Sequence, residues 1–191
     1  MTRILELFDK SPIVDFKSIE RIIGVREQRN NYAKLLVSNL IKQGSIRRIV
    51  KGRYTIHDDP SLAVLCFTPA YLGLQCALSF HGLWEQETLP IIVTSEKVRN
   101  GIRSVLGGNI LIRRADNRFV FGFEYVQDGD FYLPYSDIEK TFIDMIVFKE
   151  NFSEDILTGF REKIDKKKLL KYLSSYSKRT VETVMKFYNN K

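Results

Sequence analysis

The order of repeating patterns in the first 57 residues constrains the fold of this chain more than any other feature of its sequence. Apolar residues recur at helical spacing three times: near the N-terminus, from about Asp15, and from about 27 to 43. Gly44 is placed to end the third and longest pattern. Two β-rich runs then flank Lys51–Gly52 and predict a hairpin.

Three helices followed by a two-stranded ribbon is the order of a winged helix-turn-helix, which we expect over residues 1–57. The alternation in the first run of the ribbon is imperfect. Ile46, Ile49 and Val50 cannot all face one side of a regular strand. We therefore expect either a β-bulge or an exposed Val50.

The third helix carries side chains suited to reading DNA. An α-helix fits the major groove, where Arg pairs with guanine and Asn or Gln with adenine. The candidates for base readout are Gln28, Arg29, Asn30, Asn31 and Lys34, with Arg26 just ahead of them.

The hairpin supplies cations for phosphate or minor-groove contact. These candidates are Arg47, Arg48, Lys51 and Arg53. The competing interpretation is a winged helix that docks proteins and merely has a solvated basic face. We favour DNA, because charge sign, position and expected fold coincide.

Charge is segregated along the 191 residues, which carry a net charge of +7. Residues 1–57 hold 12 basic and 5 acidic side chains, and residues 161–191 hold 10 and 3. Residues 58–160 are acidic, with 8 basic and 15 acidic side chains. Such segregation suggests parts with different partners.

Residues 61–191 predict a second, mixed domain that ends in helices, so the fold class is α+β. Helices are expected at 61–67 and 70–80, and a capping box of Ser136 and Glu139 is expected to start another. The remaining expectations are strands at 89–94, 110–113, 119–126 and 131–133, a turn at Asp128–Gly129, and helices capped by Ser153, Asp165 and Ser177.

The basic C-terminal helices allow two interpretations. Their lysines either form a solvated outer face or make a second surface for DNA or an acidic partner. The residues concerned are Lys166, Lys167, Lys168 and Lys171.

No catalytic, cofactor or metal site is expected, and the chain does not resemble an enzyme. Asp137 and Glu139 fall in the first turn of an expected helix, where acidic residues favour capping and the helix dipole. Asp144 is five residues beyond Glu139 and is not expected on the same face, so the three do not form a shared site. Cys66 and Cys76 lack the spacing of zinc ligands and predict buried thiols. Without a signal peptide or an apolar run long enough to span a membrane, the expected location is the cytoplasm.

Two segments resemble the AbiEi antitoxin family: Tyr71-Leu-Gly-Leu-Gln-Cys-Ala-Leu-Ser-Phe-His-Gly-Leu83 and Ser136-Asp-Ile-Glu-Lys-Thr-Phe-Ile-Asp-Met-Ile146. The wing sequence Lys51-Gly-Arg-Tyr54 is similar too, and the resemblance covers nearly the whole chain. Cys76 departs from the Ser expected before Ala-Leu. This family pairs an N-terminal winged helix with a larger C-terminal domain.

The resemblance implies a sequence-specific repressor that binds double-stranded DNA at its own promoter. It also implies the antitoxin of a type IV toxin–antitoxin operon, which counters a nucleotidyltransferase-like toxin without a stable complex. The family includes stand-alone regulators as well. The alternative from another class is a protein-interaction module, in which the acidic 58–160 surface binds a partner and no toxin is neutralised.

Overall fold

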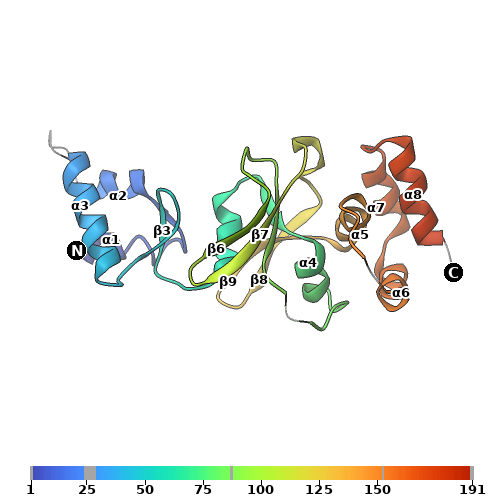
Figure 1. The fold of residues 1–191 in the computed structure, drawn as a ribbon, viewed down its shortest axis with the longest axis horizontal. Helices are drawn as coiled ribbons and strands as arrows, with labels where there is room; N and C mark the ends of the chain where they lie inside the picture. Colours follow the sequence, from blue (N-terminus) through green and yellow to red (C-terminus); the bar gives the residue numbers. More distant parts are fainter. Residues whose placement is uncertain (1, 24–28, 87, 152, 190–191) are drawn as a thin grey trace.

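Three blocks follow one another along the long axis of the molecule (Figure 1). The computed structural model describes residues 2–23, 29–86, 88–151 and 153–189. A small sheet with three helices lies at the N-terminal end, a six-stranded sheet lies in the middle, and helices gather at the C-terminal end. The fold is mixed α+β, as the sequence predicts.

The N-terminal block places its helices on one face of a three-stranded antiparallel sheet of order β1-β3-β2. Gly44 and Gly52 have φ angles of 71° and 77°, so both occupy left-handed positions at the expected helix end and turn. β1 was not expected, because two residues leave no periodic signal. The elements are α1 (Thr2–Leu5), β1 (Val14–Asp15), α2 (Phe16–Ile23), α3 (Arg29–Lys42), β2 (Arg47–Val50) and β3 (Arg53–Thr55).

A β-bulge in β2 lies where the N-terminal block packs against the middle block. The register shifts between Arg48 and Val50, which confirms the expected irregularity. Ile46 packs with the helices of the N-terminal block, whereas Ile49 packs with the core of the middle block. The ribbon is therefore buried on both faces near the bulge and is fixed to the sheet that follows.

The middle sheet has the order β6-β7-β5-β4-β9-β8 and mixes parallel and antiparallel pairs. Its two faces are covered differently: Ile92 packs with residues of the 3₁₀ segment η1, and Ile91 packs with residues of α4 and α5. The elements are η1 (Pro60–Cys66), β4 (Ala70–Leu72), α4 (Leu74–Phe80), β5 (Ile91–Thr94), β6 (Gly101–Val105), β7 (Gly108–Arg114), η2 (Asn117–Phe119), β8 (Phe123–Asp128) and β9 (Phe131–Ser136).

The prediction of one helix over 70–80 is wrong. Residues 70–72 form β4, Gly73 interrupts, and only 74–80 are helical. β4 is a central strand buried on both faces, so its apolar run lacks the alternation that distinguishes strand from helix. The predicted helix at 61–67 is also corrected, since it is a 3₁₀ segment.

Two strand predictions need correction as well. β6 was missed, because it is a half-exposed edge strand with a mixed pattern. The single strand expected over 119–126 is divided, and β8 begins only at Phe123. Gly122 separates the parts with a φ of 68°, where its backbone lies against Tyr172 and Lys140.

The capping box is wrong in its residues. Asp137 caps α5 (Ile138–Val147) by accepting from the Lys140 amide at 2.8 Å, while Ser136 is the last residue of β9. Glu139 instead accepts from the backbone amide of Asp165 at 2.8 Å. Glu139 therefore binds a backbone amide of a distant segment instead of the amide of Ser136 that the capping box requires.

The C-terminal helices follow the sequence prediction closely. Ser153, Asp165 and Ser177 each accept a backbone amide hydrogen bond at a helix start, as expected. The helices are α6 (Glu154–Lys163), α7 (Lys166–Leu173) and α8 (Lys178–Asn189). Across the described ranges, none of the helices combines the length and the apolar content needed to cross a bilayer.

Candidate nucleic-acid interface

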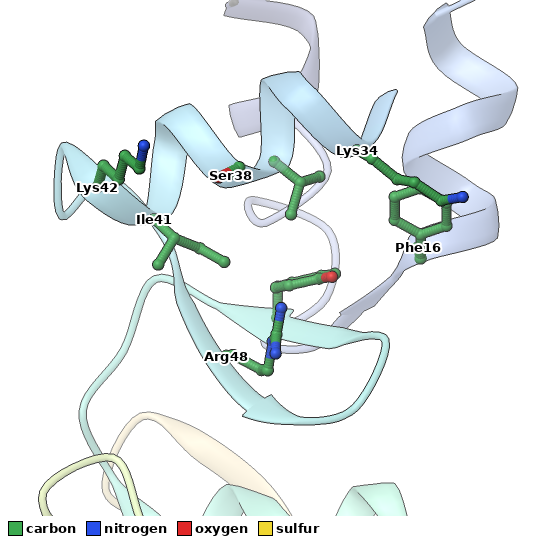
Figure 2. Close-up of a pocket in the computed structure, with 8 residues that line it drawn as sticks. Phe16, Lys34, Ser38, Ile41, Lys42 and Arg48 are labelled. Atoms are coloured by element: carbon green, nitrogen blue, oxygen red, sulfur yellow. The ribbon is translucent and has the colours of Figure 1, made fainter. Parts of the chain in front are cut away.

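An open groove of about 530 Å³ runs between α3 and the β2–β3 ribbon (Figure 2). In Figure 2, Lys34 and Lys42 project from α3 at positions about two turns apart, and Arg48 lies on the ribbon between them. The lining residues are Phe16, Lys34, Val37, Ser38, Ile41, Lys42, Arg48 and Tyr54.

The rim of this groove is cationic. Lys34, Lys42 and Arg48 are all exposed. Within the described ranges, none of the three forms an ion pair with a carboxylate. The three positive charges are therefore available to an anionic ligand without the loss of an existing contact.

The floor of the groove is apolar and fixed. Val37 and Tyr54 are buried in the N-terminal core, and Phe16 and Ile41 pack against that core. Arg48 lies directly across the ribbon from Tyr54, so both side chains share the face that looks toward α3. Because these residues are buried, they fix α3 and the ribbon relative to each other, and with them the positions of the three cations on the rim.

Two predicted contact residues lie on the other face of the ribbon. Arg47 pairs with Asp58 at 3.2 Å, and Arg53 donates from Nη1 to the carbonyl of Leu65 at 3.5 Å. Both side chains are directed toward the segment that leads into the middle block. Arg47 and Arg53 therefore do not line the groove, although both are close to Arg48 in the sequence.

The remaining predicted residues are distributed as follows. Lys51 is exposed in the turn of the ribbon, and Asn31 is exposed on α3. Arg29 and Asn30 begin the backbone of α3, but their side chains are not among those described. Arg26 and Gln28 lie outside the described residues.

Six residues of the groove were not among the predicted contact residues: three that belong to the floor, Val37, Ile41 and Tyr54, and also Phe16, Ser38 and Lys42. A signal for Ser38 and Lys42 was present, because Lys34, Ser38 and Lys42 recur every four residues and so form one ridge of a helix. Phe16 had no such signal, since its place depends on how α2 packs.

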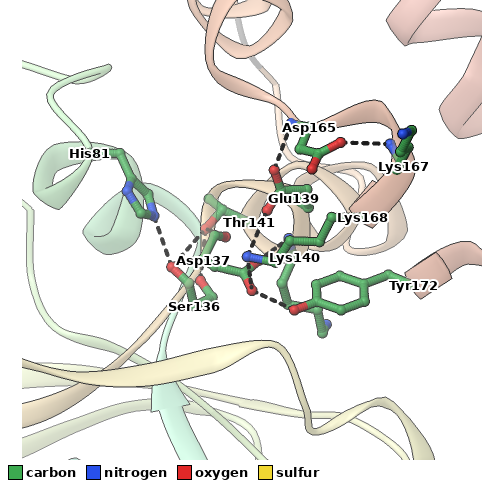
Figure 3. Close-up of polar contacts among 10 residues, drawn as sticks. All are labelled: His81, Ser136, Asp137, Glu139, Lys140, Thr141, Asp165, Lys167, Lys168 and Tyr172. Carbon is green, nitrogen blue, oxygen red and sulfur yellow. Dashed lines mark hydrogen bonds and ion pairs between the residues drawn. The ribbon is translucent and has the colours of Figure 1, made fainter. Parts of the chain in front are cut away.

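Asp137 and Glu139, for which the sequence predicts a structural role, connect the start of α5 to α7 (Figure 3). Asp137 and Glu139 both pair with Lys168, at 3.1 and 3.2 Å. Burial lowers the pKa of Lys168, but the hydrogen bonds that its ammonium group donates to Asp137 and Glu139 outweigh burial and raise that pKa above its usual value. These contacts tie α7 to the start of α5.

Asp144, further along α5, is buried and forms an ion pair with Lys140. Its carboxylate also accepts from the Tyr71 hydroxyl at 2.6 Å. Burial raises the pKa of Asp144 and lowers that of Lys140, because both charged forms lose hydration. The ion pair is enclosed, so it has the character of a core contact between α5 and β4.

His81 has a backbone contact, and both cysteines are free thiols. His81 follows α4 and lies with Nε2 at 2.8 Å from the Ser136 carbonyl oxygen. Cys66 and Cys76 are only partly buried, which corrects the expectation of buried thiols. Burial raises the pKa of Cys66 to about 11. Among the described residues, no three His, Cys, Asp or Glu side chains are grouped to hold a metal ion.

No protein-family model matches the chain, and no curated protein sequence matches it. Among solved structures, it is similar to the crystal structure of the Rv2827c protein from Mycobacterium tuberculosis. The TM-score is 0.61 at 14% sequence identity, and the match covers 95% of this chain and 72% of that one. At this identity the likeness concerns the fold alone, and the AbiEi resemblance stays a prediction.

Proposed function

We propose that residues 1–57 form a winged helix-turn-helix that binds double-stranded DNA, and that the protein is a sequence-specific repressor. The observation that carries the proposal is the cationic groove between α3 and the ribbon. Lys34, Lys42 and Arg48 surround it, and Lys51 extends the charge to the turn. Duplex DNA is a polyanion whose affinity for proteins is dominated by such contacts.

The arrangement suits two kinds of DNA contact, one to phosphates and one to bases. The ribbon and one side of α3 offer cations for the phosphate backbone, while the outward side of α3 is exposed and can reach base edges. The apolar floor fixes the angle between these two elements. Binding at a defined site in a promoter would exclude polymerase, which is the simplest mechanism of repression.

The resemblance to AbiEi proteins extends the proposal to an antitoxin that represses its own operon. A neighbouring gene for a nucleotidyltransferase-like protein would support that role, and its absence would favour a stand-alone regulator. The direct test is footprinting on the DNA upstream of the protein's own gene. Protection of one discrete segment is expected, and uniform or absent protection would contradict specific repression.

A second candidate function rests on the β8–β9 hairpin. Tyr125 and Tyr132 share one face there, with exposed fractions of 58% and 65%. Exposed Asp130 lies in the adjoining turn, and exposed Glu124 lies on the reverse face of the strand. Exposed tyrosines beside acidic residues suit a basic protein partner. If duplex binding fails even at low salt, this hairpin becomes the preferred interface, and Tyr125→Ser with Tyr132→Ser is the variant that tests it.

A further inference from the structure

The outward face of α3 carries two parallel ridges of different chemistry. Lys34, Ser38 and Lys42 form the ridge that lines the groove. Asn31, Leu35 and Asn39 form the next ridge, again spaced by four residues, and all three are exposed. An aliphatic side chain flanked by two amides thus projects to solvent from the helix proposed to enter the major groove.

Leu35 is the unexplained member of this ridge. Its exposed fraction is 59%, whereas the other face of the helix is well packed. The residues that α3 buries, Ala33, Val37 and Leu40, lie on the opposite side of the helix. Packing against the described residues therefore does not account for an apolar side chain at this position.

Base chemistry supplies such a reason. In the major groove, adenine presents the N7 acceptor and N6 donor that an Asn amide can pair with, and thymine presents an apolar C5-methyl group. From Asn31 to Asn39 the helix rises about 12 Å, which is comparable to three or four base-pair steps. The ridge matches a short run of A·T pairs.

Self-association is the competing explanation for Leu35, and charge disfavours it. Lys34 and Lys42 flank the ridge, so a second copy docked on this face would oppose like charges across an apolar contact. Phosphates on either side of a major groove would instead complement them. The same surroundings that repel another copy attract DNA.

We propose that Asn31, Leu35 and Asn39 read A·T pairs in the major groove, with Leu35 against a thymine methyl group. The inference rests on the proposed DNA-binding function and specifies which sequences that function selects. Selection of duplexes from a random pool by the full chain should enrich a core of adjacent A·T pairs.

Deoxyuridine provides the sharpest probe, because it differs from thymidine only by the methyl group. Replacing the core thymidines of the selected duplex should weaken binding of the unaltered protein about fourfold for each methyl contacted. L35A should bind the thymidine and deoxyuridine duplexes equally. L170A is the matched control, since Leu170 is another exposed leucine, on α7, and this variant should keep the full discrimination.

A second arm tests the amides. Replacing core adenines by 7-deazaadenine removes the N7 acceptor and should weaken the unaltered protein but not N31A/N39A. Enrichment of G·C cores, or an L35A variant that still discriminates thymidine from deoxyuridine, would overturn the inference while leaving DNA binding intact. Loss of a dimer in L35A, seen by sedimentation, would likewise overturn it. Absence of any duplex binding would instead refute the proposed function.

Discussion

Arg47 and Arg48 are neighbours in the sequence, but they have different environments. Arg48 faces α3 across the groove, while Arg47 turns to the other side of the ribbon and pairs with Asp58. Residue type and position in the sequence could predict that the ribbon is basic. They could not predict which cations face the groove, because that depends on strand alternation around the bulge.

This difference predicts opposite results for two arginines. Arg48→Ala should weaken duplex binding and reduce the salt slope by about one, with the free energy of unfolding nearly unchanged. Arg53→Ala should instead lower the free energy of unfolding by about 1 kcal/mol, because its contact with the Leu65 carbonyl is lost. Gel shifts and urea unfolding measure the two quantities. Equal effects of both variants on affinity would contradict the assignment.

The buried pair of Lys140 and Asp144 was not predicted as a pair, since nothing local marks a lysine as buried. Its exposed side-chain fractions are 0% and 3%. Lys140→Met should destabilise the fold by about 3–5 kcal/mol, because it leaves the Asp144 carboxylate buried and unpaired. The double variant Lys140→Met/Asp144→Asn should recover much of that loss, since the amide oxygen still accepts from Tyr71. Urea unfolding measures both, and a double variant no better than the single one would show that charge is not the cause.

At the scale of elements, the sequence predicts best where a local signal decides. Caps and glycines located the C-terminal helices and the ribbon turn, because these signals act within a few residues. β4 was mistaken for helix because its pattern is set by burial on both faces. Glu139 was assigned to a local cap because its partner, the Asp165 amide, comes from another element.

The start of α2 provides a prediction with a defined pH dependence. The carboxylate of Asp15 accepts from the Ser18 amide at 2.7 Å, and this hydrogen bond lowers the pKa of Asp15 below its ordinary 3.8. Stability from the charged cap is therefore complete above that ordinary pKa and is lost as the pH falls through the lower, folded value. Asp15→Ala should cost about 1 kcal/mol at about pH 7 and clearly less at about pH 2.5. A cost that does not change with pH in urea unfolding would contradict the charged cap.

At the scale of the whole molecule, the sequence predicted two basic ends around an acidic middle, and Figure 1 places those ends at opposite extremes of the long axis. It could not predict that one lysine of the C-terminal set is already engaged. Of the four lysines of α7, Lys168 pairs with Asp137 and Glu139, and the other three, Lys166, Lys167 and Lys171, are exposed.

This placement predicts that the C-terminal lysines do not share the duplex held by α3. Changing Lys166, Lys167 and Lys171 to Glu should alter affinity for a short duplex by less than about threefold, because separated charges are screened beyond about 8 Å at physiological salt. Lys168 is left unchanged to protect the fold. Anisotropy titrations measure the effect, and a large loss would establish a second DNA-contacting surface.

The central claim is that the groove between α3 and the ribbon binds the DNA backbone, and the salt dependence of duplex affinity tests it most directly. Four described cations, Lys34, Lys42, Arg48 and Lys51, predict a slope of log affinity against log salt of about −3.6 or steeper, measured between about 50 and 200 mM. Changing Lys34, Lys42 and Arg48 to Glu should abolish binding, whereas the C-terminal triple variant should keep the slope. No binding at about 50 mM salt, or a slope that the groove variant leaves unchanged, would contradict the account.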